Sequence, residues 1–89
     1  MDEKTSHARY EKMQGKTFRN EDGSLMEGDI FKNGVIMRFH NGLLDGQGES
    51  AIDCEDGHIE FWENGYIKIV GNIRGGYKEF WKDGVRIEK

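Results

Sequence analysis

Apolar and polar side chains alternate in short stretches along most of this chain, each about six residues long. A period of two residues is typical of β-strands, in which every second side chain lies on the same face of a sheet. The alternation places three groups of apolar side chains each on one face: Val35 with Met37 and Phe39, Ile67 with Ile69, and Val85 with Ile87.

Dipeptides that favour tight turns separate these stretches. Type I′ hairpin turns need a positive φ at both central residues, which is why Asn-Gly and Asp-Gly are preferred there. The chain has eight such signals: Asp22–Gly23, Asn33–Gly34, Asn41–Gly42, Asp45–Gly46, Asp56–Gly57, Asn64–Gly65, Gly75–Gly76 and Asp83–Gly84. We therefore predict consecutive antiparallel hairpins.

The turns recur at regular intervals, every 23 residues in the first half of the chain and every 19 in the second. Residues 33–42, 56–65 and 75–84 align without gaps, and an aromatic residue occupies the same position in each, namely Phe39, Trp62 and Trp81. Periods of this length are typical of stacked supersecondary units that bury their apolar faces against one another.

Both faces of the predicted strands carry aromatic residues. Phe61 lies opposite Trp62, and Phe80 lies opposite Trp81. Two interpretations are open at this point. In one, a first face forms the core and the N-terminal segment partly covers the second. In the other, an exposed aromatic stripe holds a partner.

The fold class that follows is all-β, an antiparallel meander of about six or seven short strands in a single sheet. Residues 16–89 would form this repeat domain. Residues 1–15 would be a short N-terminal helix or a disordered tail, because Ser6 can cap a helix over residues 7–14 and Gly15 can end it.

Two stretches resemble the MORN repeat, which runs Asp-Gly, then Gly-x-Trp or Gly-x-Phe, then Asn-Gly. Residues 22–34 supply Asp22–Gly23, Gly28, Phe31 and Asn33–Gly34, with Ile30 as one residue more than the pattern has. Residues 41–57 supply Asn-Gly, the Gly46-x-Gly48 pair and Asp-Gly. The resemblance covers residues 22–57. It implies hairpins laid side by side in a ribbon-like sheet, and a non-enzymatic scaffold, often dimeric, that contacts proteins or sometimes lipids.

Composition limits the classes of function. Only 35% of the 89 residues are hydrophobic, which suffices for a thin core but not for an enclosed catalytic cavity. The single cysteine, Cys54, cannot form an intrachain disulfide. We expect a cytoplasmic protein, because no apolar run approaches the length of a membrane span and the N-terminus lacks a signal-peptide pattern.

Charge is distributed unevenly, with a local balance of 0 over residues 1–38, −7 over residues 39–67 and +3 over residues 68–89. The acidic stretch contains no lysine or arginine. It predicts either an ordinary solvated surface or an acidic face that steers a basic partner. The candidate residues are Asp45, Glu49, Asp53, Glu55, Asp56, Glu60 and Glu63.

The expected function is protein binding without catalysis, as a MORN-like scaffold or adaptor. Aromatic residues dominate many binding hot spots, so the candidate anchors are Phe39, Trp62, Tyr66 and Trp81. The alternative is a small acidic inhibitor, of the type found in phages and mobile elements. It would block a nucleic-acid-binding protein such as a host defence nuclease complex.

Other chemistry finds no support in the sequence. Cys54 and His58 lie four residues apart across a predicted turn, but Cys54 alternates with Ile52 and is expected to pack as a small hydrophobic side chain. The spacing of Asp53, Glu55, Asp56 and His58 matches no calcium or zinc pattern, and the glycines do not form a nucleotide loop. We therefore predict no catalytic residues, no metal and no cofactor. We expect neither direct nucleic-acid binding nor membrane binding. A homodimer remains open, because sheet edges invite pairing.

Overall fold

A computed structural model of the protein describes residues 12–82 and 84–87. Within these residues eight short strands form one antiparallel sheet. The strands are β1 (Gly28–Lys32), β2 (Val35–His40), β3 (Leu43–Leu44), β4 (Ile52–Cys54), β5 (His58–Glu63), β6 (Tyr66–Asn72), β7 (Tyr77–Lys82) and β8 (Val85–Ile87).

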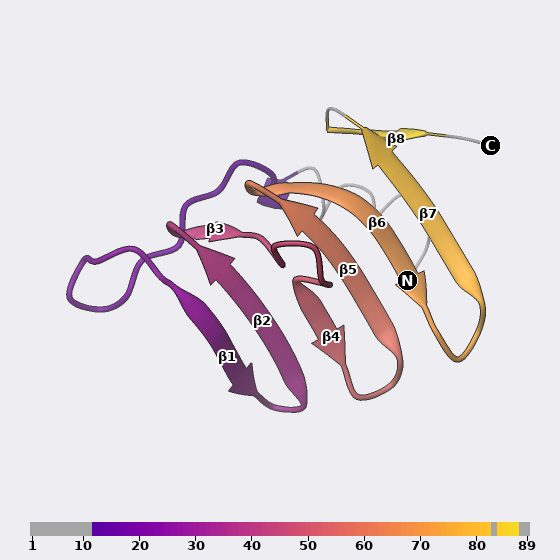
Figure 1. The fold of residues 1–89 in the computed structure, drawn as a ribbon, viewed down its shortest axis with the longest axis horizontal. Coiled ribbons are helices and arrows are strands. Elements are labelled where there is room, and N and C mark those ends of the chain that lie inside the picture. The colour runs from indigo at the N-terminus through magenta and orange to yellow at the C-terminus, as the bar shows by residue number, and fades with distance from the viewer. Residues whose placement is uncertain (1–11, 83, 88–89) are drawn as a thin grey trace.

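The strands lie side by side almost in chain order, as Figure 1 shows from β1 in indigo to β8 in yellow. The order is β1-β2-β4-β5-β6-β7-β8, and β3 pairs with the end of β2 outside this path. The prediction of an all-β meander is confirmed. The expected count of six or seven strands is too low, because the described chain also forms the two-residue β3 and the three-residue β4.

The three aligned repeats form β2, β5 and β7, each six residues long. Their shared aromatic side chains, Phe39, Trp62 and Trp81, all lie in the hydrophobic core. The core also contains Leu44, Ala51, Ile52, Ile67 and Val70. The face of the sheet that carries Trp62 and Trp81 is called the core face below, and the opposite one the open face.

Three of the predicted turns have the expected backbone, whereas Asp22–Gly23, Asp56–Gly57 and Gly75–Gly76 have a positive φ only at the second residue. Both residues have positive φ at Asn33–Gly34, Asn41–Gly42 and Asn64–Gly65. These three turns join β1 to β2, β2 to β3 and β5 to β6, respectively. Neither residue of Asp45–Gly46 has a positive φ, and the left-handed pair lies two residues further on, at Gln47 and Gly48, with φ of 50° and 97°. Glu49 N–H donates to the Gly46 carbonyl at 3.0 Å and closes this turn.

A β-bulge corrects one of the predicted faces. The register between β5 and β6 shifts at Phe61 and Trp62, so that Trp62 pairs with Ile67 while Phe61 pairs with Ile69. Lys68 is the extra residue. Paired residues share a face, so Ile67 lies on the core face and Ile69 on the open face.

The segment before β1 packs on the core face. The Phe18 and Phe39 rings lie 5.3 Å apart between centroids, and Met13 and Met26 also contact the core. Phe18 N–H donates to the Gly42 carbonyl. The predicted helix over residues 7–14 falls mostly outside the described residues, whereas Gly15, its predicted end, has a φ of 73°.

Candidate functional site

The four aromatic residues predicted as anchors do not lie together on the surface. Phe39, Trp62 and Trp81 are buried, with 4%, 2% and 3% of their surface exposed. Trp62 Nε1 donates to Glu60 Oε1 at 2.8 Å, and Trp81 Nε1 donates to Glu79 Oε1 at 3.4 Å. These three side chains therefore stabilise the fold from within. Tyr66 is the one that stays exposed, at the start of β6.

The acidic residues divide into internal and exposed groups. Asp45 and Glu60 are buried, and Asp53 is half-buried. Glu60 Oε2 lies 2.7 Å from His58 Nε2, in addition to its contact with Trp62. The exposed members are Glu49, Glu55, Asp56 and Glu63. The −7 balance of this segment therefore overstates the number of carboxylates that a partner can contact.

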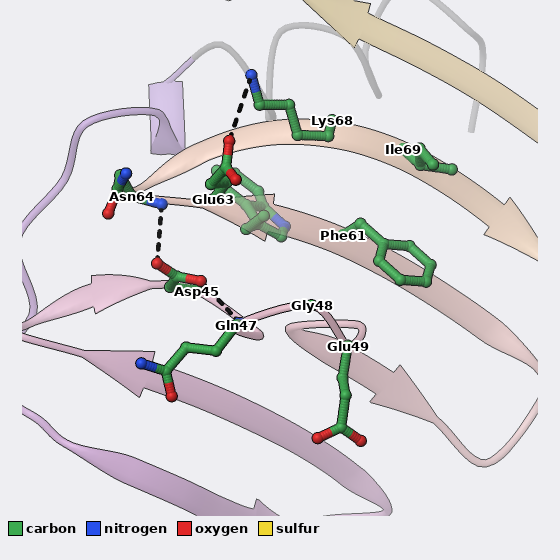
Figure 2. A pocket seen from close by; sticks show the side chains of 10 residues that line it. Asp45, Gln47, Gly48, Glu49, Phe61, Glu63, Asn64, Lys68 and Ile69 are labelled. Atoms are coloured by element: carbon green, nitrogen blue, oxygen red, sulfur yellow. Dashed lines mark hydrogen bonds and ion pairs between the residues drawn. The ribbon is translucent and has the colours of Figure 1, made fainter.

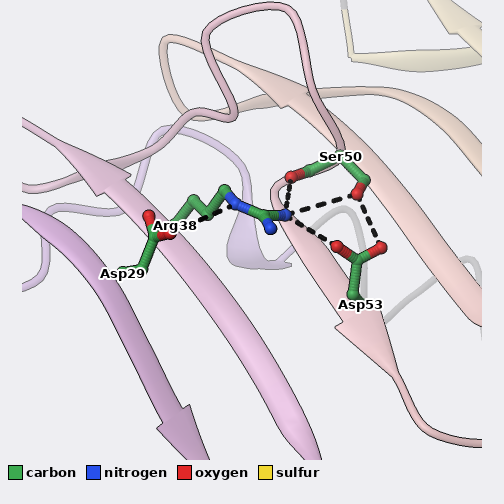
Figure 3. Close-up of polar contacts among 4 residues, drawn as sticks. All are labelled: Asp29, Arg38, Ser50 and Asp53. Atoms are coloured by element: carbon green, nitrogen blue, oxygen red, sulfur yellow. Dashed lines mark hydrogen bonds and ion pairs between the residues drawn. The ribbon is translucent and has the colours of Figure 1, made fainter.

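Asp53 belongs to an ion-pair network on the open face, shown in Figure 3. Arg38 Nη1 donates to Asp53 Oδ2 at 2.7 Å and to the Ser50 carbonyl at 2.7 Å, while Arg38 Nε lies 3.5 Å from Asp29. Ser50 Oγ donates to Asp53 Oδ1 at 2.6 Å. Burial by itself would raise the pKa of Asp53, but the hydrogen bonds from Ser50 and Arg38 and the charge of Arg38 outweigh it, and the pKa is lowered.

This network separates the exposed carboxylates into two places. Glu55 and Asp56 lie in the turn between β4 and β5. Glu49 comes from the loop between β3 and β4, and Glu63 ends β5 beside the turn to β6. Arg38 compensates the charge of Asp53 and Asp29 between them. The sequence predicted one acidic face, and the structure places two smaller groups.

A groove on the open face brings Glu49 and Glu63 together with apolar side chains. Two cavities, of about 410 and 450 Å³, share Phe61 and Ile69 as lining residues. Figure 2 shows Phe61 and Ile69 on neighbouring strands, with Glu49 below Phe61 and Glu63 and Lys68 to its upper left. The first cavity is also lined by Asp45, Gln47, Gly48, Trp62 and Asn64. The second is also lined by Ile59, Gly71, Asn72, Ile73, Gly76, Tyr77 and Lys78.

The loop between β3 and β4 is held rigidly at the groove. Asp45 Oδ1 accepts from Gln47 N–H at 2.8 Å, and Asp45 Oδ2 accepts from Asn64 N–H at 3.2 Å. Gly46 N–H donates to the Trp62 carbonyl at 3.2 Å. Asp45 is thus a structural residue that ties the loop to the β5–β6 turn, and Glu49 follows it at the rim.

Sequence reasoning placed Phe61 opposite Trp62 but did not select it as a binding residue, and it did not select Ile69. The alternation of β5 alone could have indicated Phe61, because Trp62 and Phe61 cannot both face the core. Ile69 had no such signal, since its face depends on the bulge at Lys68.

No group of three or more His, Cys, Asp or Glu side chains that could hold a metal ion occurs in the part of the chain that the structure describes. Cys54 and His58 lie on the core face, where His58 contacts Glu60. Nor do residues 12–82 and 84–87 include a helix with the length and apolarity to cross a membrane.

Comparisons with known proteins identify no relative: no family model, no curated protein and no solved structure matches this chain. The resemblance to the MORN repeat therefore stays a prediction. The hairpin meander agrees with what that resemblance implies for the fold, and function has to be argued from the groove itself.

Proposed function

We propose that this chain is a non-enzymatic protein-binding module that receives its partner in the groove of the open face. The observation that carries the proposal is the groove's floor. Phe61 and Ile69 are half-buried side chains shared by two adjoining cavities, on the face opposite the filled core. Cavities of a few hundred Å³ with an apolar floor and a few polar groups at the rim are typical binding sites.

The surroundings of the groove favour a macromolecular partner. Ile73 extends the apolar surface beyond Phe61 and Ile69, with 72% of its surface exposed. Both cavities are open rather than enclosed, which suits side chains presented by another protein. The exposed carboxylates Glu49 and Glu63 then favour a partner whose contact surface is basic.

A second candidate function follows from the other acidic group. Glu55 and Asp56 are exposed in the β4–β5 turn, so acidic residues reach the surface at two separate places. A partner with an extended basic surface, such as a nucleic-acid-binding protein, could contact both groups. The module would then act as an inhibitor that occupies that surface.

Affinity enrichment with matched variants tests the main proposal. The full chain is immobilised, and bound proteins from its natural host are quantified by mass spectrometry for the wild type and for Phe61→Ser, Ile73→Ser and Phe31→Ser. Phe31 is the control, because it is 68% exposed on the open face of β1 but lies outside both cavities. Losing a buried phenylalanine contact removes about 1.5–3 kcal/mol, or about ten- to hundredfold in affinity.

The expected result is a protein that binds the wild type and Phe31→Ser alike but is depleted at least tenfold with Phe61→Ser. Ile73→Ser distinguishes lost contact from misfolding, because Ile73 is largely exposed and its substitution should leave the fold intact. We expect this variant to capture less of the same protein than the wild type, with a smaller loss than Phe61→Ser. If every captured protein is retained by both groove variants, the groove is not the binding surface. Release of the captured protein by added oligonucleotide would support the inhibitor function.

A further inference from the structure

The two cavities of the groove carry different charges. The first cavity is lined by three carboxylates, Asp45, Glu49 and Glu63, and by one base, Lys68. The second is lined by Lys78, with no acidic residue among the side chains that form it. A partner therefore meets negative charge at the end near the β3–β4 loop and a weakly positive end beyond Ile69.

Lys68 leaves most of that negative charge uncompensated. Its Nζ lies 4.0 Å from Glu63 Oε1, and both side chains are well exposed, at 41% and 68%. Exposed pairs with this geometry contribute little, because water competes for both groups. The Asp45 carboxylate is fixed by two backbone N–H groups, so it cannot turn away from the cavity. Glu49 is exposed at the rim.

The floor of the first cavity adds an aromatic surface. Phe61 lines the same cavity as Glu49, Glu63 and Lys68, and Figure 2 shows its ring to the right of all three. A cation over an aromatic face is attracted by the ring, and a planar guanidinium can stack on it while its N–H groups reach carboxylates that line the same cavity. An arginine side chain combines all of these contacts, and its apolar stem suits the contact with Ile69.

The second cavity has the opposite preference. Ile59 and Ile73 give it apolar walls, and its volume of about 450 Å³ accommodates a large aliphatic or aromatic side chain. Because the two cavities share Phe61 and Ile69, one short extended segment can fill both. In an extended segment, side chains two residues apart point the same way.

We propose that the groove is a receptor for an extended, basic segment of a partner protein, with an arginine in the first cavity and a large apolar side chain in the second. This inference rests on the proposed function and adds to it the chemistry of the partner. The arginine stacks on Phe61 and is held by Glu49 and Glu63. The apolar side chain lies against Ile59 and Ile73.

Selection from a display library of random decapeptides tests this inference and does not require the partner protein itself. The immobilised full chain selects peptides, which are sequenced and then measured one by one. We expect enrichment of arginine, with lysine second, within a few residues of a large apolar residue. The strongest peptide should bind Glu49→Gln/Glu63→Gln at least tenfold more weakly than the wild type. The control Glu21→Gln/Asp22→Asn removes two exposed carboxylates outside both cavities and should change binding less than twofold.

A double-mutant cycle separates direct contact from general attraction. Replacing the selected arginine with glutamine should weaken binding to the wild type but hardly change binding to Glu49→Gln/Glu63→Gln. Binding that needs Phe61 and Ile73 but is indifferent to the arginine and to both glutamates overturns this inference and leaves the proposed function intact. A selection that yields no peptide sensitive to Phe61→Ser and Ile73→Ser counts against both.

Discussion

Gly46 is the position where a single methyl group should cost the most. A Cβ on Gly46 would lie 1.8 Å from the carbonyl oxygen of Glu49 and 2.6 Å from its carbonyl carbon, both of which are backbone atoms. Restoring an ordinary contact of 3.4 Å requires the loop to open by about 1.6 Å. That movement breaks the Glu49 N–H to Gly46 carbonyl bond, and the neighbouring bond from Gly46 N–H to Trp62 weakens with it.

The cost of Gly46→Ala can be estimated from these contacts. Overpacking at a site that cannot yield costs about 1–3 kcal/mol, and each lost backbone hydrogen bond adds about 1 kcal/mol. We therefore expect the free energy of unfolding to fall by about 3–5 kcal/mol. For a domain of this size that corresponds to a Tm lower by about 15–30 °C. Circular dichroism during thermal and urea unfolding measures both quantities.

Gly48→Ala is the matched control in the same loop. Gly48 has a φ of 97°, but a Cβ there meets nothing within 4 Å. Its substitution costs only the backbone strain of a left-handed alanine, about 1–2 kcal/mol. If Gly46→Ala proves no more destabilising than Gly48→Ala, the loop that forms the rim of the first cavity has a different conformation from the one described.

Three further predictions concern the core and the ion pairs. Leu44→Ala should lower the free energy of unfolding by about 2–5 kcal/mol in urea titration, because Leu44 is 1% exposed and its removal leaves a cavity. Trp62→Phe should cost about 2–4 kcal/mol in the same assay, since it loses volume and leaves buried Glu60 Oε1 without the indole donor at 2.8 Å. The lowered pKa of Asp53 stabilises the fold fully above its unfolded value of 3.8, and this contribution disappears as pH falls through the folded value. Asp53→Asn should thus be less stable than the wild type at pH 7. Urea titrations at decreasing pH should show this stability difference shrinking below about pH 4. A stability difference that is constant down to pH 2 would mean that the Arg38 contact does not depend on the charge of Asp53.

The hairpin architecture could be predicted because local chemistry determines it. Asn33–Gly34 and Asn64–Gly65 adopt left-handed conformations that few other residue pairs tolerate, and the alternation beside them fixes the strand faces. The repeat alignment also placed Phe39, Trp62 and Trp81 at equivalent positions. The alignment could not predict which of the two sheet faces becomes the core, because both faces carry aromatic residues.

The groove was harder to predict because two non-local features build it. The bulge at Lys68 turns Ile69 to the open face, and a strict alternation cannot anticipate an inserted residue. The loop depends on Asp45 bonding across to Asn64, 19 residues later in the chain. Charge counting failed for a related reason: the sequence does not reveal that Glu60 faces the core or that Arg38 reaches Asp53.

The central claim is that the open face, and not the core face or a sheet edge, binds the partner. Isoleucine δ1-methyl NMR with a paramagnetic co-solute tests it directly, because Ile59 and Ile69 line the groove whereas Ile52 and Ile67 are buried in the core. In the free protein we expect stronger relaxation at Ile59 and Ile69. On addition of the captured partner or the selected peptide, relaxation at these two methyls should fall, because a well-packed interface excludes the co-solute from them. The account is contradicted if relaxation at Ile59 and Ile69 is unchanged and Ile30, on the edge strand β1, becomes protected instead. That result would indicate pairing along the sheet edge, either with a partner or with a second copy of the chain.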